Sequence, residues 1–322
     1  MNIPEPKYKE TSVIDETHDE TQQELAKLRS RVGEMQLQLD SLRQRQHVPM
    51  PPFPDSNPST PFMSYSTCNA TDFLHPRYKE ICDLQRHPFI WHRKLWEFVF
   101  VIHHLVESGL VKSGSRGLVF GVGTERLPSL FASMGAKIVA TDMSTEHANA
   151  SDWTNGQHTA NLETLRYPEI IDGALFDSNV SYQACDMNDI DPALVDFDFN
   201  WSSCCFEHLG SIEAGLQFVI NAVEKTLRVG GIAVHTTEYN LSSNDATVES
   251  PHVVIFRNRD ILELVKRLRD RGHIVQPFVV APNSHHLDFH IDMPPFVQDP
   301  HLKLLLWEHI ATSAGIVVQR GR

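Results

Sequence analysis

The 322-residue sequence lacks a long apolar run and an excess of basic residues. The longest apolar stretch, residues 98–106, is interrupted by His103 and His104, whereas a membrane-spanning helix needs about 20 apolar residues. Lysine and arginine number 28 against 41 acidic residues, so the formal charge is −13. Proteins that coat nucleic acid or bind anionic membranes need a basic face. We therefore expect no membrane span and no nucleic-acid partner.

Cysteine is also scarce. The five cysteines are odd in number and show no Cys-x-x-Cys spacing, which argues against a disulfide framework and a structural zinc site. The N-terminal residues lack the apolar core of a signal peptide. Reduced thiols favour a cytoplasmic location. With 41% hydrophobic residues, the chain has ample material for a folded core.

The N-terminal part carries a short heptad pattern. Apolar residues recur with spacings of three and four between residues 25 and 42, which is typical of a coiled-coil seam. Gly33 weakens this helix by about 1 kcal/mol relative to alanine. We expect self-association into a homo-oligomer through residues 25–42, with packing of one amphipathic helix on its own domain as the alternative. Residues 1–46 form this polar tail and helix, and residues 47–65 form a proline-rich linker.

Residues 66–322 alternate apolar strands with amphipathic helices, which predicts an α/β fold with a doubly wound, mostly parallel sheet. We expect strands at 117–121, 137–142, 180–185, 197–203, 232–237, 273–280 and 315–319, giving a seven-stranded sheet. The expected helices cover 87–110, 127–134, 212–227, 260–271 and 302–310.

The first strand leads into an informative loop. The strand is followed by Gly121-Val122-Gly123 and then by a predicted helix, and Asp142 lies nineteen positions after Gly123. Glycines allow a sharp turn and a close approach to a ligand, and an acidic residue at this distance suits a ribose. The combination predicts a nucleoside-cofactor site, with a tight turn and a capping carboxylate as the alternative.

The same loop distinguishes two cofactors. A dinucleotide site needs Gly-x-Gly-x-x-Gly, but here the third position is Arg126. Glu125 at the helix start would repel a phosphate and tolerate a cationic sulfonium or ammonium group. The residues therefore favour S-adenosylmethionine (SAM) over NAD.

With these motifs the chain resembles the class I SAM-dependent methyltransferases over roughly residues 90–319. The Phe-Glu-His-Leu stretch at 206–209 and the Leu-Arg-Val-Gly-Gly turn at 227–231 are similar to family motifs, although Val229 replaces the usual proline and Phe120 the usual acidic residue. Residues 201–211 and 235–240 further resemble a bacterial group often associated with surface-glycan biosynthesis. The resemblance implies cofactor contacts by Gly121, Gly123, Glu125, Asp142, Met143, Asp186, Met187 and Ser202.

Methyl transfer to a hydroxyl requires a proton acceptor near the strand ends. His208 follows the fourth strand, and His235 and Glu238 end or follow the predicted fifth strand. These three are the candidate catalytic residues, with a structural hydrogen bond as the alternative role for each. The acceptor would be a small molecule or a glycan hydroxyl. N-methyl transfer and a non-catalytic, SAM-binding scaffold are the competing functions.

Three further features are singled out without a firm role. Asp288, His290 and Asp292 alternate in a polar loop and could bind a metal, cover a substrate or face solvent. Cationic and aromatic residues at 91–98 could line the site or pack as a helix. Further acceptor or adenine contacts are expected after the second strand, at Trp153, Asn155, Gln157 and His158.

Overall fold

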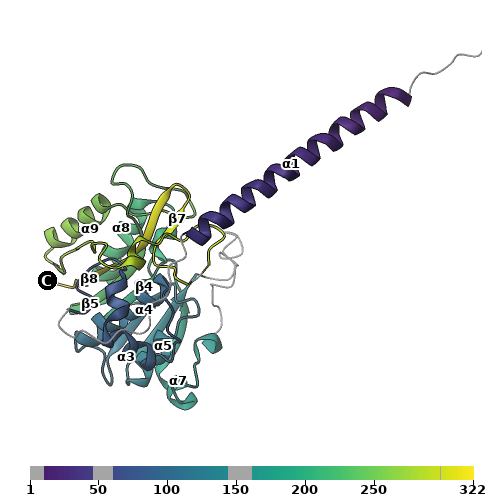
Figure 1. The fold of residues 1–322 in the computed structure, drawn as a ribbon. Coiled ribbons are helices and arrows are strands. Elements are labelled where there is room, and N and C mark those ends of the chain that lie inside the picture. The colour runs from purple at the N-terminus through teal and green to yellow at the C-terminus, as the bar shows by residue number, and fades with distance from the viewer. Residues whose placement is uncertain (1–10, 46–60, 144–161, 298) are drawn as a thin grey trace, which may run out of the picture. The chain divides into compact units, whose positions relative to one another are not determined.

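The computed structural model describes residues 11–45, 61–143, 162–297 and 299–322. The chain divides into two units, Met1–Pro49 and Met50–Arg322. The first contains one long helix, α1 (Thr11–Arg45), which includes the predicted heptad segment and extends beyond it (Figure 1). Apolar side chains of the seam are solvent-exposed in the single chain, with Leu28 48% and Val32 65% exposed.

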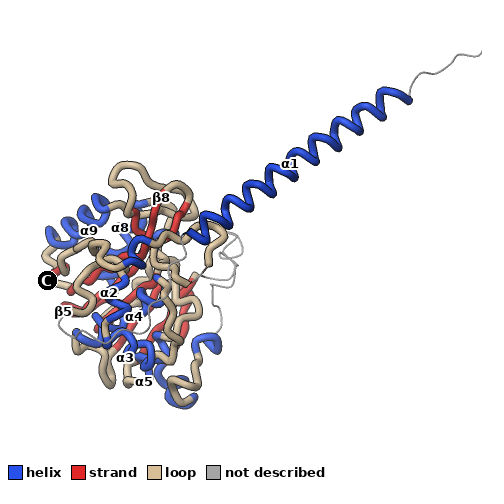
Figure 2. The backbone as a smooth tube through the Cα atoms, in the orientation of Figure 1, coloured by secondary structure: helices blue, strands red, loops and turns tan. Residues whose placement is uncertain are grey.

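The second unit is built on one mixed sheet, whose strands are red in Figure 2. Its eight strands have the order β3-β2-β1-β4-β5-β8-β6, with β7 paired to β8. The strands are β1 (Arg116–Phe120), β2 (Lys137–Asp142), β3 (Val180–Ala184), β4 (Phe197–Ser203), β5 (Leu227–Asn240), β6 (Ile274–Val275), β7 (Leu304–Leu306) and β8 (His309–Gln319). Strands β1 to β5 pair with one another in parallel, whereas β8 runs antiparallel to β5, β6 and β7.

The predicted α/β class is confirmed, but the sheet has one strand more than predicted. The helix expected at 302–310 is wrong: this segment forms β7 and the start of β8, joined by a turn in which Trp307 has a positive φ of 52°. The two strands pair with each other as a hairpin, with Leu304 opposite Ala311 and Leu306 opposite His309, and this pairing outweighed the helical apolar pattern. The strand expected at 273–280 shrinks to the two residues of β6.

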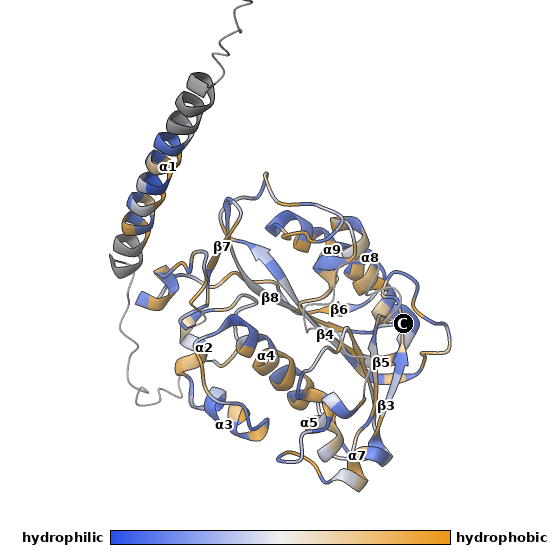
Figure 3. Ribbon diagram, turned by 90° about the vertical axis from the view of Figure 1, so that its right-hand side faces the viewer, coloured by the Kyte–Doolittle hydropathy of each residue, from blue (hydrophilic) through white to orange (hydrophobic). Residues whose placement is uncertain are grey.

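The main helices are α2 (Ala70–Leu74), α3 (Pro76–Leu84), α4 (Arg93–Glu107), α5 (Leu127–Ser133), α7 (Gly173–Asn179), α8 (Ile212–Asn221) and α9 (Asn258–Asp270). Helix α4 contacts β4, β5 and β8, while α5 contacts β2 and β3. Helices α8 and α9 pack against each other on the opposite face from α4 and α5, so helices cover both faces of the sheet (Figure 3). None of these described helices is long and apolar enough to cross a bilayer.

The register of the strands decides which side chains share a face. Because successive side chains point to opposite faces, Phe120, Ser202 and His235 lie in one row across β1, β4 and β5. The row faces α8, where Phe218 packs edge-on against both Phe120 and His235. The neighbouring residue Trp201 faces the opposite side and packs on Phe131 of α5.

Packing of the sheet unit begins a few residues before position 66. Met63 is buried, and the ring of Phe62 stacks on His75 with centroids 4.8 Å apart. Thr67 forms an isolated bridge with Ala314 of β8. These contacts anchor the start of the unit on its antiparallel strands.

Candidate functional site

A cavity opens at the carboxyl ends of the parallel strands, where the strand order reverses between β1 and β4. In open α/β sheets this switch point is where ligands bind. The cavity has a volume of about 430 Å³, which falls in the range of small-molecule sites. Its walls come from the loops after β1, β2, β3 and β4, with α4 and the loop around Pro251 completing it.

The loop after β1 adopts a backbone that requires glycine. Gly121 and Gly123 have φ values of 59° and 51°, a region that residues with a Cβ rarely adopt. A Cβ on Gly121 would also lie 2.9 Å from the sulfur of Cys205. The two glycines therefore let the chain turn tightly along the cavity wall.

Asp142, at the end of β2, ties this loop to the neighbouring strand. Its Oδ2 accepts a hydrogen bond from the backbone N–H of Gly123 at 3.0 Å, and its Oδ1 accepts one from Met143 at 2.8 Å. Asp186 follows β3, and its Oδ1 accepts from the Asn188 N–H at 2.8 Å. Both carboxylates line the cavity, on neighbouring strands.

Glu125 is the third acidic residue in the cavity wall. It is 7% exposed, and its Oε1 accepts a hydrogen bond from the indole N–H of Trp201 at 2.6 Å. Burial raises the pKa of Glu125 to about 7, although the Trp201 hydrogen bond and the charge of Lys94 oppose the rise. A carboxylate that is costly to keep charged in the cavity would be stabilised by a cationic ligand.

The structure brings the predicted cofactor residues together with one exception. The cavity wall contains Gly121, Gly123, Glu125, Asp142, Met143, Asp186 and Met187. Ser202 is fully buried instead, and its hydroxyl hydrogen-bonds Nδ1 of His235 at 2.8 Å on the α8 side of the sheet. Ser202 therefore does not line the cavity, and its contact with the cofactor stays a prediction.

Of the three predicted catalytic residues, only His208 lines the cavity. Its Nδ1 lies 2.8 Å from the carbonyl oxygen of His252, and its Nε2 is 3.9 Å from Glu207 Oε1. A backbone carbonyl can only accept, so Nδ1 carries the proton in the neutral ring and Nε2 is the basic nitrogen.

His235 and Glu238 do not occupy the predicted positions at a strand end. Strand β5 continues to Asn240 because it pairs with β8 as far as Ala311. His235 is consequently enclosed within the sheet, and burial lowers its pKa to about 3. Glu238 is also buried, and neither residue lines the cavity, so direct proton transfer by either one stays a prediction.

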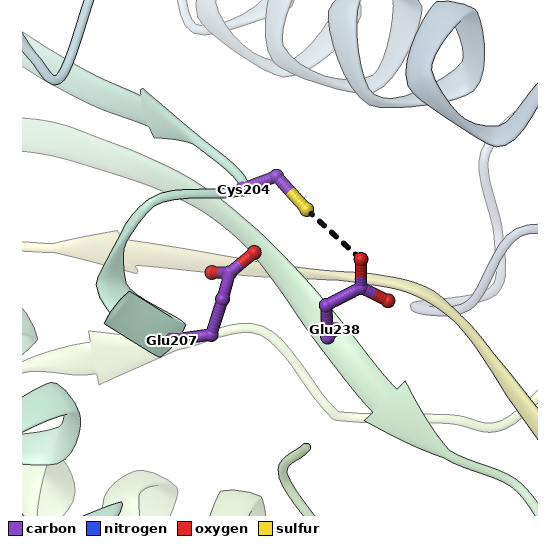
Figure 4. Close-up of side chains that lie close together, drawn as sticks. All are labelled: Cys204, Glu207 and Glu238. Carbon is purple, nitrogen blue, oxygen red and sulfur yellow. Dashed lines mark hydrogen bonds between the residues drawn. The ribbon is translucent and has the colours of Figure 1, made fainter. Parts of the chain in front are cut away.

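Glu238 belongs to a buried network of charges beside the cavity. Arg93 of α4 forms ion pairs with Glu238 and with Glu97. Burial raises the pKa of Glu238 to about 7 even though Arg93 opposes the rise. Figure 4 shows Cys204, Glu207 and Glu238 converging, with the Cys204 thiol hydrogen-bonded to Glu238 at 3.7 Å.

These three side chains are the one group among the described residues whose geometry could hold a metal, with donor atoms within 4.8 Å of one another. Because Arg93 already ion-pairs with Glu238 there, we assign the group to an internal ion-pair network. In the other candidate loop, Asp288 caps backbone N–H groups, and Asp292 hydrogen-bonds His301 at 2.5 Å. Both carboxylates therefore have structural roles.

Several cavity residues were not predicted as site residues. Cys204 and Cys205 both line the cavity, and Cys204 has a positive φ of 57°. Tyr167 and His252 come from loops without a recognisable motif. Lys94 and Phe98 belong to the segment 91–98 that was singled out as a possible part of the site, and their four-residue spacing places both on one face of α4. Trp153, Asn155, Gln157 and His158 lie outside the described residues.

Comparison with known proteins gives distant structural similarity only. No protein-family model and no curated protein sequence matches the chain. Among solved structures, it is similar to a putative sarcosine dimethylglycine methyltransferase from Galdieria sulphuraria, with 14% identity over 69% of this chain and 83% of that one and a TM-score of 0.42. A DhpI–S-adenosylhomocysteine (SAH) complex matches with 14% identity over 76% and 93% and a TM-score of 0.39.

A third solved structure is the N-terminal domain of EvdMO1 in the presence of SAH and D-fucose, with 13% identity over 69% of this chain and 82% of that one and a TM-score of 0.40. At this low level of similarity, the assignment of a function depends on the cavity itself.

Proposed function

We propose that the chain is a SAM-dependent methyltransferase that transfers a methyl group to a hydroxyl of a small-molecule or glycan acceptor. The observation that carries this proposal is the placement of three carboxylates, Glu125, Asp142 and Asp186, around a glycine turn at the switch point of the sheet. The set fits a nucleoside with a cationic substituent better than a dinucleotide, because the carboxylate of Glu125 lies next to the start of α5, where it would repel a pyrophosphate.

Each carboxylate has a distinct role in this proposal. Asp142 accepts hydrogen bonds from the ribose hydroxyls, and its bond to Gly123 holds it in place for that purpose. Asp186 accepts from the adenine amine, with the thioether of Met187 against the ring. Glu125 is the counter-ion for the cationic amino-acid part of the cofactor. When bound, SAM supplies a methyl group that its sulfonium activates for displacement.

His208 is the residue that removes the acceptor proton. Its Nδ1 is held by the His252 carbonyl, so Nε2 would accept the proton of the acceptor hydroxyl as the methyl–sulfur bond breaks, the methyl group passes to the oxygen and SAH is left. The imidazolium formed lies near Glu207, which is 3.9 Å from Nε2. Glu207 is fully buried, and its Oε2 accepts from Thr237 at 2.9 Å, which fixes the carboxylate.

An activity screen tests the proposal. The purified chain is incubated with SAM and hydroxyl-bearing or amine-bearing acceptors, and the products are analysed by mass for the gain of one methylene unit together with stoichiometric SAH. We expect methylated hydroxyl products with the wild type and none with Asp142→Ala. Methylation of amines alone would make the protein an N-methyltransferase. Binding of SAM without turnover of any acceptor would favour the scaffold function.

We also propose that the chain forms a homo-oligomer through residues 25–42 of α1. The exposed apolar seam recurs at heptad spacing, and polar residues such as Glu24 and Lys27 flank it and pair with each other at 3.7 Å. A second copy of the same helix would bury the seam in the manner of a coiled coil. The five free cysteines support a cytoplasmic location.

A further inference from the structure

Most charges of the cavity wall are segregated by element; the exception is Arg126, which lies beside Glu125 and forms an ion pair with Glu169. The described acidic lining residues, Glu125, Asp142 and Asp186, lie on the loops after β1, β2 and β3. The wall formed by α4 and the β4–α8 connection contains Lys94 and His208, and His252 adjoins them from its own loop. The acidic part of the cavity therefore suits a cationic cofactor. The part beside α4 carries the positive charge of Lys94 and is left for the acceptor.

Lys94 is the charged group in this second half. Burial disfavours its charged form, but the Glu97 carboxylate raises the pKa of Lys94 above its usual value, so the side chain stays an ammonium. Its Nζ donates to the Ser203 carbonyl at 2.9 Å and to Glu97 Oε2 at 3.3 Å. An ammonium has three donors, so one N–H is left for a ligand, and 39% of the side chain is exposed.

Apolar surface surrounds this ammonium. Phe98 lies one helical turn along α4, with its ring centroid 5.7 Å from Lys94 Nζ, and Leu209 and Pro251 line the same cavity. None of the described lining residues is Asn or Gln, the side chains that would recognise several hydroxyls of a neutral sugar. The surface suits an apolar body that carries one polar substituent near Lys94.

We propose that the acceptor is a small hydroxylated organic acid, whose carboxylate binds Lys94 and whose apolar body packs on Phe98, Leu209 and Pro251. This inference rests on the proposed methyltransferase function and narrows its acceptor. A carboxylate fits better than a phosphate, because one remaining N–H suits a single ion pair, whereas phosphates are usually held by several donors or an arginine fork. The acceptor hydroxyl then faces His208, which lines the same wall.

Matched pairs of acids and amides test the inference. The protein is first saturated with SAH and then titrated by calorimetry with para-hydroxybenzoate, salicylate and mandelate and with the primary amide of each. We expect the acids to bind about tenfold more tightly than their amides, because a charge-assisted hydrogen bond is lost in the amide. Added sodium chloride should weaken binding of the acids only.

Variants assign the preference to Lys94. Lys94→Met should bind the acid and the amide equally. Lys94→Arg should keep the preference for the acid, which would also show that position 94 tolerates substitution. Lys79→Met is the matched control, because Lys79 pairs with Asp83 on the exposed surface of α3. Equal binding of acids and amides to the wild type, binding of neither, or an unchanged preference in Lys94→Met would overturn the inference. Failure of SAH itself to bind would instead overturn the proposed function.

Discussion

Glu125 links cofactor binding to pH in a way that can be calculated. Burial raises its pKa to about 7. About half of the molecules therefore carry a neutral Glu125 at pH 7, about nine in ten at pH 6 and about one in ten at pH 8. If a cationic part of the cofactor binds only the ionised form of Glu125, a neutral Glu125 must release its proton when the cofactor binds.

The affinity for SAM should then fall about tenfold between pH 8 and pH 6, with release of about half a proton per SAM at pH 7. The amino group of SAM titrates near pH 8 itself, so the effect of Glu125 is read as the difference between the wild type and Glu125→Gln. The amide oxygen introduced by this substitution can still accept the Trp201 hydrogen bond, which keeps the local geometry.

Calorimetric titration in two buffers of different ionisation enthalpy measures the protons released. We expect the wild type to release about half a proton more than Glu125→Gln at pH 7. The neutral ligand methylthioadenosine is the control, because it has neither a sulfonium nor an amino-acid part and should release none. Equal proton release by the wild type and Glu125→Gln, with both proteins binding SAM, would refute the role of Glu125 as counter-ion.

Three other predictions address the proton acceptor, the assembly and the buried histidine. His208→Ala should lower kcat by about 10²–10⁴ with SAM affinity retained; normal turnover would make His208 structural. Leu28→Asp combined with Val32→Asp should lower the oligomer mass in light scattering, and an unchanged mass would exclude the seam as the interface. Because the pKa of His235 is about 3 when folded and about 6.5 when unfolded, its contribution to stability is complete above pH 6.5 and is lost as the pH falls, by about 3 kcal/mol at pH 4. Urea unfolding of His235→Gln should show correspondingly less acid sensitivity than the wild type, and identical pH profiles would contradict this.

The parallel half of the fold could be predicted because its signals are local. The first four strands are short and lie between polar or glycine-containing segments, and β2 (Lys137–Asp142) and β4 (Phe197–Ser203) begin and end at the predicted residues. The glycine turn and Asp142 were found for the same reason, since a tight turn restricts which residues can occupy it.

The antiparallel half of the sheet and the cavity wall formed by α4 depend on contacts between residues far apart in the sequence. Strand β5 reaches Asn240 only because β8 pairs along it, and this extension encloses His235 and Glu238. The sequence places both residues after the apolar run of residues 232–234, which gives no sign of the longer strand. Lys94 and Phe98 have the right helical spacing, but only the tertiary packing of α4 shows that their face borders the cavity.

The central claim, that the cavity holds SAM, is tested most directly by titrating the purified protein with SAM and with NAD. Asp142→Ala removes the carboxylate that accepts the Gly123 N–H and, in this account, the ribose hydroxyls, while Asp177→Ala changes an exposed acidic residue of α7 as the control. We predict saturable binding of SAM to the wild type and to Asp177→Ala, none detectable to Asp142→Ala, and no binding of NAD. Binding of NAD in preference to SAM, or SAM affinity unaffected by Asp142→Ala, would contradict the account.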